Sequence, residues 1–144
     1  MINFREIDRN NIWDILKLKV SEEQMHFVAT NAVSIAQAKA QPECVPLAIY
    51  DGETPVGFVM YCFDLEEKEY CIYRLMIDSR YQRKGYGRDA LQKIIDKIKE
   101  DKDHHKILIS FEPNNSVAKS LYISMGFVPD GRIIDGELVC VLEY

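Results

Sequence analysis

The fold of this chain is decided around one glycine-containing stretch, Arg80-Tyr81-Gln82-Arg83-Lys84-Gly85-Tyr86-Gly87-Arg88. The residues before it, Tyr70–Ile77, are apolar apart from Arg74, which predicts a strand buried on both faces. After it, the apolar residues Leu91, Ile94, Ile95 and Ile98 recur at the spacing i, i+3, i+4, i+7. This period is typical of an amphipathic helix, which we place from Tyr86 to about Lys99. The stretch is therefore a loop between a central strand and a helix.

The composition of this loop predicts an anion-binding site. Gly85 and Gly87 let the backbone approach an anion without interference from Cβ atoms. The new helix points free N–H groups and the positive end of its dipole at the same place, and Arg83, Lys84 and Arg88 add positive charge. A pyrophosphate fits this description, although the spacing matches neither the Rossmann nor the P-loop motif. Taken alone, the same turn is also typical of an ordinary strand-to-helix loop.

Working outward, hydrophobic periodicity predicts a mixed α/β order in one domain, residues 1–144. We expect Trp13 to be a core residue of a first helix that runs from Ile12 to about Val20. Ser21–Gln24 resembles a capping box and opens a second helix, with a break near Asn31. The other expected strands and helices are a first strand Ile2–Glu6, a hairpin of Pro46–Tyr50 with Pro55–Asp64, a strand Lys106–Phe111, a helix Ser116–Met125 with Gly126 after its end, and strands Phe127–Val128 and Leu138–Leu142.

Composition and charge narrow the function classes. The chain has 144 residues, of which 47% are hydrophobic, so one core can form without metal ions or disulfides. A net charge of −5 disfavours nucleic acid and makes small cationic molecules the easier partners. The four cysteines have no Cys-x-x-Cys spacing and are expected to be reduced, with Cys62 and Cys71 placed to face each other across paired strands.

The expected cellular location and the expected lack of a metal site both follow from patterns that the sequence does not contain. The N-terminus lacks the charged and apolar regions of a secretory signal, and no apolar run reaches the roughly 18 residues of a membrane helix. We therefore expect a cytoplasmic protein without a membrane partner. His26, His104 and His105 have no ligand spacing, so we expect no metal.

A second motif follows the next predicted strand and reads Asn115-x-x-Ala118-x-x-Leu121-Tyr122-x-x-x-Gly126-Phe127. It comes after Gln82-x-x-Gly85-x-Gly87, which follows the preceding strand. Together the two motifs strongly resemble the GNAT family of N-acetyltransferases, and the resemblance covers essentially the whole chain in element order. It implies a mixed, mostly antiparallel sheet of six to seven strands, with helices on both faces and a V-shaped split between two central strands.

The resemblance also implies a cosubstrate, acetyl-CoA, and a set of binding residues. Main-chain groups of Leu75 and Ile77 would pair with its pantetheine arm, and Asn115 would contact the same arm. Tyr122 would stand near the thioester sulfur and protonate the leaving thiolate, although an aromatic residue here could also simply pack one helix face. Backbone N–H groups would hold the pyrophosphate, from Gln82, Arg83, Lys84, Gly85, Tyr86, Gly87 and Arg88.

The expected acceptor is a primary amine. Residues 24–38 are similar to the N-terminal helices of bacterial diamine and spermidine/spermine N-acetyltransferases. This resemblance implies direct attack by a diamine or polyamine in a ternary complex. The acidic turn Asp64–Glu69 could attract a polycation, but it is also typical of a solvated turn. An aminoglycoside, an amino acid or a protein N-terminus are alternative acceptors, a non-catalytic acyl-CoA-binding module is the alternative class, and the sequence allows a homodimer.

Acetyl transfer to an amine needs a base. A primary alkyl amine has a pKa near 10.4, so at pH 7 only about one molecule in a few thousand is neutral and nucleophilic. Tyr73 stands where several polyamine acetyltransferases carry a carboxylate. Glu112, at the end of the next strand, is the leading substitute, with Glu22 or Glu23 acting through water behind it. Each of these carboxylates could instead be solvated or cap a helix.

Overall fold

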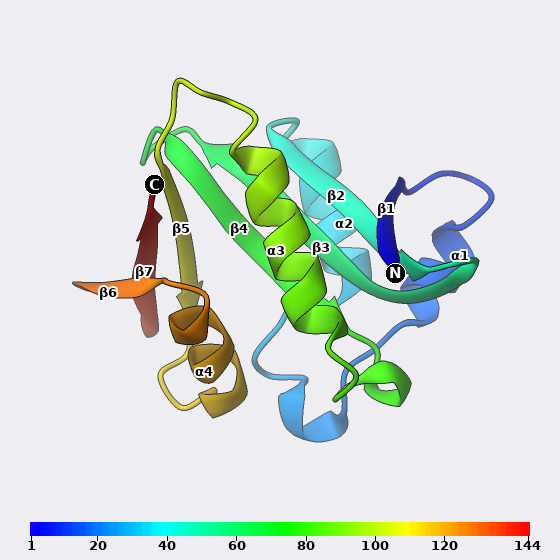
Figure 1. Cartoon of the computed structure of the whole chain (residues 1–144). Coiled ribbons are helices and arrows are strands. Elements are labelled where there is room, and N and C mark those ends of the chain that lie inside the picture. The colour runs from blue at the N-terminus through cyan, green and yellow to red at the C-terminus, as the bar shows by residue number, and fades with distance from the viewer.

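Seven strands form one mixed sheet in the computed structural model, which describes residues 1–144 (Figure 1). Their order across the sheet is β1-β2-β3-β4-β5-β7-β6, and only the β4–β5 pair is parallel. The predicted mixed, mostly antiparallel sheet is therefore confirmed. The strands are β1 (Ile2–Glu6), β2 (Cys44–Asp51), β3 (Thr54–Asp64), β4 (Glu69–Ile77), β5 (Lys106–Phe111), β6 (Val128–Ile134) and β7 (Glu137–Glu143).

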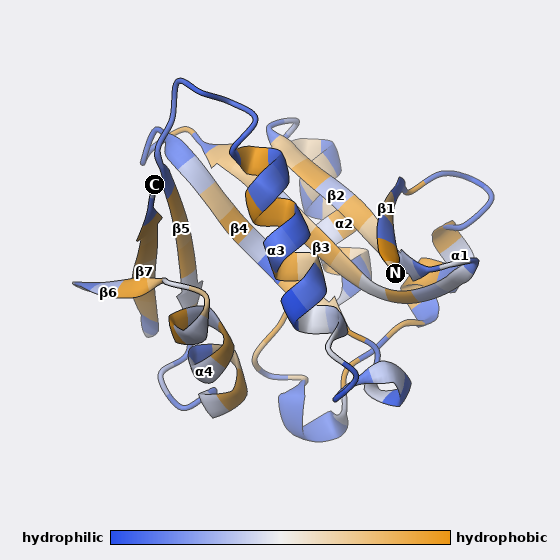
Figure 2. Cartoon of the chain, in the orientation of Figure 1, coloured by the Kyte–Doolittle hydropathy of each residue, from blue (hydrophilic) through white to orange (hydrophobic).

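Helices cover both faces of the sheet, as expected. The helical elements are α1 (Ile12–Lys17), the short η1 (Glu22–Gln24), α2 (Asn31–Ala40), the short η2 (Ser79–Tyr81), α3 (Tyr86–Ile98) and α4 (Ser116–Ser124). The buried row of α3, including Leu91 and Ile94, packs with Val59, Ile72 and Ile107 on one face. Residues of α1 and α2 pack on the other face. In Figure 2, α3 alternates between hydrophobic and hydrophilic residues, while the central strands are mostly hydrophobic.

The β4–β5 pair opens part of the way along the sheet. Only Tyr70–Ile72 of β4 pair with Ile107–Ile109 of β5, although β4 continues to Ile77 and β5 continues to Phe111. A bulge leaves Tyr73 without a partner on β3, because Arg74 pairs with Met60 and Ile72 pairs with Tyr61. Bulges bend a strand and redirect its side chains. The expected V-shaped split is therefore present, and Figure 1 shows α4 beside β5 at its open end.

Two expectations at the N-terminal helices are wrong. Trp13 is 71% exposed, because α1 buries Ile15 and residues two positions apart do not lie on the same face of a helix. The side chain of Ser21 makes no capping hydrogen bond, and the helix that begins after it is the three-residue η1. The longer α2 begins at Asn31 instead, where the Thr30 side chain accepts a hydrogen bond from Val33 N. Residues 25–30 therefore form a non-helical link between η1 and α2.

Three of the four cysteines form a row across the sheet. Cys62 on β3 lies opposite Cys44 on β2 and opposite Cys71 on β4, which confirms the predicted facing of Cys62 and Cys71. All four thiols are free and buried. Burial raises the pKa of Cys62 to about 12. No helix is long and apolar enough to span a membrane.

Candidate active site

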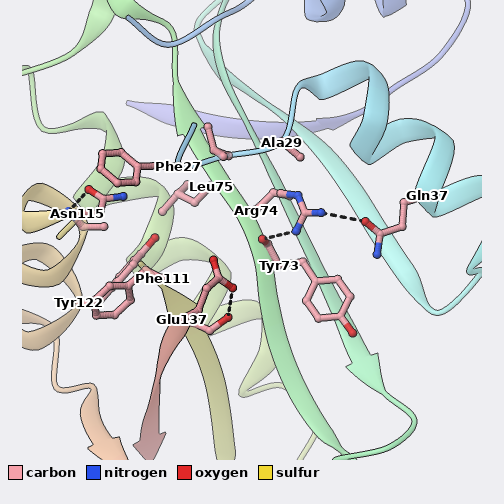
Figure 3. A pocket seen from close by; sticks show the side chains of 13 residues that line it. Phe27, Ala29, Gln37, Tyr73, Arg74, Leu75, Phe111, Asn115, Tyr122 and Glu137 are labelled. Atoms are coloured by element: carbon pink, nitrogen blue, oxygen red, sulfur yellow. Dashed lines mark hydrogen bonds between the residues drawn. The ribbon is translucent and has the colours of Figure 1, made fainter. Parts of the chain in front are cut away.

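Two connected pockets follow the split between β4 and β5. The first, which we call the loop pocket, has a volume of 350 Å³ and lies along the loop after η2 and the start of α3. The second, the sheet pocket, has a volume of 460 Å³ and lies between β4, β5 and the link before α2 (Figure 3). Six residues line both: Phe27, Val28, Leu75, Asn115, Ala118 and Tyr122. The two pockets therefore form one continuous hollow.

The loop pocket has a series of free backbone donors at one end. None of the seven backbone N–H groups from Gln82 to Arg88 donates a hydrogen bond to another protein atom. Gly85 has a left-handed φ of 87° at the N-cap of α3, and Arg83 has a φ of 64°. Successive N–H groups in such turns point toward a common centre and bind anions. The backbone is therefore suited to a phosphate or pyrophosphate group.

Gly87 leaves space for a ligand. A Cβ atom built on Gly87 would meet only Ile77 Cγ1 and Leu121 Cδ2, both at 3.9 Å, which is ordinary contact distance. The fold itself therefore does not require a glycine here. Because Gly87 lines the loop pocket, the missing side chain leaves room for a group bound against the helix N-terminus.

The basic side chains of the loop differ in their placement. Arg83 lines the loop pocket, whereas Lys84 and Arg88 do not. Arg88 reaches across to α4, where its Nη2 donates to Ser124 Oγ at 2.8 Å. Lys84 lies 5.9 Å from the ring of Tyr81. The backbone N–H groups of Lys84 and Arg88 remain in the free series, so a contact with an anion would come from their main chain.

Two of the residues predicted to bind the donor line the hollow, and each uses a polar group in a hydrogen bond within the protein. Ile77 lines the loop pocket, and its carbonyl accepts a hydrogen bond from Gln82 Nε2 at 2.9 Å. Asn115 lines both pockets and caps α4, with Oδ1 accepting from Ala118 N at 3.3 Å. The Nδ2 group of Asn115 has no protein partner and can donate to a ligand.

Tyr122 lies where the two pockets meet. Its ring packs against Phe111 and Phe127, with centroids 5.4 and 6.0 Å away, and the residue is only 8% exposed. Its hydroxyl makes no hydrogen bond to the protein. Burial raises the pKa of Tyr122 to about 12, so the hydroxyl is protonated at neutral pH. The residue therefore combines a packing role with a free proton donor that faces the hollow.

The expected base does not line the hollow. Glu112 follows the last residue of β5, and it is absent from the lining of both pockets. Glu22 and Glu23 are exposed on η1. The carboxylate that does line the sheet pocket is Glu137, whose Oε1 accepts a hydrogen bond from Ser110 Oγ at 3.0 Å (Figure 3).

One cation also lines the sheet pocket. Arg74 donates from Nη1 to the Tyr73 carbonyl at 2.8 Å and from Nη2 to Gln37 Oε1 at 3.1 Å (Figure 3). Its buried Nε has no partner, and it forms no ion pair with a carboxylate. The pocket therefore holds one acidic and one basic side chain rather than an excess of acidic groups.

Sequence reasoning did not find Glu137, Arg74 or Gln37 as site residues. Glu137 directly follows the Asp135-Gly136 turn, a position that is typical of a solvated hairpin end. It lines the pocket because β7 inserts between β5 and β6, and Glu137 directly precedes Leu138, which pairs with Phe111 at the end of β5. The single charged residue in an apolar strand was a usable signal for Arg74.

Comparison with known proteins identifies the family. Residues 10–127 match the model of the acetyltransferase (GNAT) family. The chain is 32% identical over 149 aligned positions to the spermine/spermidine N(1)-acetyltransferase of Bacillus subtilis (strain 168), covering 99% of this chain and 98% of the relative. The chain belongs to the GNAT family of acetyltransferases, and it is an acyltransferase enzyme.

Solved structures agree on the fold. The spermidine N-acetyltransferase of Vibrio cholerae, in complex with CoA and spermine, has a TM-score of 0.77 at 17% identity, over 99% of this chain and 95% of that one. The aminoglycoside acetyltransferase AAC(6')-Ib, in complex with coenzyme A, has a TM-score of 0.81 at 14% identity, over the same shares. Enzymes with different acceptors thus share this fold, so the fold alone does not identify the acceptor.

Proposed function

We propose that this protein transfers an acetyl group from acetyl-CoA to a primary amine of spermidine or spermine, by direct attack in a ternary complex. Acetyl-CoA is the acyl donor of GNAT acetyltransferases. One observation carries the proposal: a single hollow has free backbone N–H groups at one end and the free hydroxyl of Tyr122 where its two pockets meet. The near full-length similarity to a spermine/spermidine acetyltransferase supports the choice of acceptor.

The loop pocket suits the donor. In our proposal the N–H groups from Gln82 to Arg88 bind the pyrophosphate, and the side chain of Arg83 adds charge to that end. Leu75 and Asn115 line the passage into the sheet pocket, where the pantetheine arm would lie. Bound acetyl-CoA supplies the thioester that an amine attacks.

Tyr122 is the proposed general acid. Because its pKa is raised to about 12, it carries its proton throughout the neutral range. Its hydroxyl is not committed to a protein acceptor, so it can donate to the departing thiolate. The rings of Phe111 and Phe127 pack against the Tyr122 ring and fix its orientation.

Glu137 is the proposed proton acceptor for the amine. It is the carboxylate that lines the sheet pocket, and a hydrogen bond from Ser110 orients one of its oxygens. A carboxylate here attracts an ammonium group and can receive its proton as the amine attacks. Glu112 is the alternative from sequence, but its side chain does not line the sheet pocket.

A second class of acceptor is favoured by Arg74. Its guanidinium lines the sheet pocket without an ion pair to a carboxylate, so it suits an amine that also carries a carboxylate or carbonyl oxygen, as an amino acid or a peptide N-terminus does. An acceptor panel separates the two candidates. Thiol release is measured with acetyl-CoA and spermidine, spermine or putrescine, and in parallel with free amino acids and a short peptide.

The polyamine proposal predicts the highest kcat/KM for spermidine or spermine. This value should fall with added salt, because attraction between an acidic protein and a polycation is screened. A higher kcat/KM for the amino acids or the peptide would overturn the polyamine assignment and leave the acetyltransferase proposal intact. Absence of thiol release with every amine would overturn both.

A further inference from the structure

One mostly non-helical segment, residues 21–29, walls both pockets. Phe27 and Val28 line the loop pocket and the sheet pocket, and Ala29 lines the sheet pocket alone. The only helical element in this segment is the three-residue η1. Val28 packs against the core residues of the α1/α2 face, which places the segment beside the sheet.

A single hydrogen bond joins this wall to the rest of the chain. Gln24 Oε1 accepts from Gln82 Nε2 at 2.8 Å, and no other residue from Ser21 to Ala29 forms a hydrogen bond or ion pair outside the segment. The remaining hydrogen bonds of the segment are local, such as Phe27 N to the Gln24 carbonyl at 2.9 Å. The polar attachment of the wall therefore depends on the side chain of Gln24.

The partner in this bond belongs to the loop. Gln82 begins the series of free N–H groups, and the same Nε2 also donates to the Ile77 carbonyl at the end of β4. The side-chain amide of Gln82 is thus fixed to the strand on one side and to the wall on the other. This amide is therefore the hydrogen-bonded connection between the loop and the wall.

We propose that Gln24 is a positioning residue that couples the loop to the wall of the sheet pocket, so that occupation of the loop orders Phe27–Ala29. This inference rests on the proposed function, which puts the donor at the loop. A ligand that orders the loop lowers the entropy cost of ordering the wall for the second ligand. Because such coupling is reciprocal, the amine should strengthen donor binding by the same factor.

Hydrogen exchange with coenzyme A alone tests the coupling without turnover. In the wild-type protein, we expect coenzyme A to slow amide exchange both in residues 83–88 and in residues 26–29. Gln24→Met keeps the length of the side chain but removes the amide oxygen. In this variant we expect slowing at residues 83–88 as in the wild type, and less than twofold slowing at residues 26–29.

Two further variants control the experiment. Gln92→Met makes the same change at an exposed glutamine of α3, whose Nε2 bonds only to Asp96, and it should behave as wild type. Gln82→Met removes the other partner of the bond. If the two glutamines act through their mutual hydrogen bond, Gln24→Met should have no further effect on wall exchange in the Gln82→Met background.

Kinetics provide the second measurement. At saturating acetyl-CoA, Gln24→Met should raise KM for the amine about two- to tenfold, the range that one net hydrogen bond corresponds to, with kcat within twofold of wild type. A purely structural role would instead lower the melting temperature and the active fraction without changing KM.

The outcomes separate the two proposals. If coenzyme A slowed amide exchange in residues 26–29 equally in Gln24→Met and in the wild type, this result would overturn the coupling and leave the proposed function standing. The coupling would also be overturned if, in the wild type, coenzyme A slowed amide exchange in residues 83–88 but not in residues 26–29. A wild-type loop that does not respond at all would overturn the donor placement and the coupling with it.

Discussion

The hydroxyl of Tyr73 donates a hydrogen bond of 2.6 Å to Asp64 Oδ2 and points away from Tyr122 (Figure 3). The bulge in β4 produces this arrangement, because it turns Tyr73 and Arg74 to the α2 side, while Leu75 packs on the α3 side. Burial and the bond to Asp64 raise the pKa of Tyr73 above its ordinary value. Tyr73 therefore keeps its proton and does not act as a base toward an amine in the hollow.

The first prediction concerns Glu137. If Glu137 accepts the amine proton, Glu137→Gln should lower kcat/KM by roughly the 10²–10⁴-fold that general acid–base steps contribute. Glu112→Gln is the matched control, and its kcat/KM should stay within about twofold of wild type. Steady-state thiol release measures both variants. A large loss in Glu112→Gln together with near-normal activity in Glu137→Gln would transfer the role of base to Glu112.

The second prediction concerns Tyr122. Tyr122→Phe keeps the ring between Phe111 and Phe127 and removes the proton donor. We expect kcat to fall by roughly 10²–10⁴-fold, with little change in coenzyme A affinity or melting temperature. Tyr122→Ala should also lower the free energy of unfolding by about 3–5 kcal/mol, because it leaves a cavity.

Comparison of kcat with thermal melting separates catalysis from packing at this position. Near-normal turnover in Tyr122→Phe would remove the hydroxyl from the mechanism. A shallow fall in kcat accompanied by a changed pH–rate profile would indicate that water replaces the hydroxyl as donor.

The third prediction concerns the anion site. Gly87→Val should weaken binding of coenzyme A, because its branched side chain fills space at the helix N-terminus. The fold should tolerate the change, since the nearest atoms to a Cβ at this position are 3.9 Å away. Lys84→Ala should have a small effect, because this side chain is exposed and does not line the pocket. Calorimetry measures both affinities, and unchanged affinity in the folded Gly87→Val variant would contradict the placement.

The fourth prediction links Tyr122 to stability at high pH. Its pKa is about 10 in the unfolded chain and about 12 in the folded protein. Above about pH 10 the unfolded chain releases this proton while the folded protein retains it. The stabilising contribution of the protonated hydroxyl is therefore complete below pH 10 and is lost as the pH rises toward 12.

Tyr122→Phe isolates this contribution, since the other titrating groups are common to both proteins. Between pH 10 and 12, the free energy of unfolding of wild type should fall relative to Tyr122→Phe by up to about 1.4 kcal/mol per pH unit. Denaturant titrations at several pH values measure the difference. Parallel pH dependences in the two proteins would show that the hydroxyl titrates normally in the folded state.

Local sequence patterns were sufficient to predict the elements that have a clear period and clear ends. The amphipathic row of α3, the apolar strand β4 and the Gly85–Gly87 turn were predicted correctly because local periodicity and backbone freedom fix them. Eight of the ten donor-binding residues that the family resemblance implied line the loop pocket, all except Lys84 and Arg88. Local signals fail where burial depends on distant partners, as the exposed Trp13 shows.

The polar groups that meet across the split are brought together by strand order and strand register. Insertion of β7 between β5 and β6 brings Glu137 to the sheet pocket, and the bulge in β4 turns Tyr73 toward Asp64 and Arg74 toward Gln37. Strand order and a one-residue change of register do not appear in the periodicity of any single segment. A register change of one residue moves a side chain to the opposite face of a sheet, so these contacts follow from pairing between segments far apart in the chain.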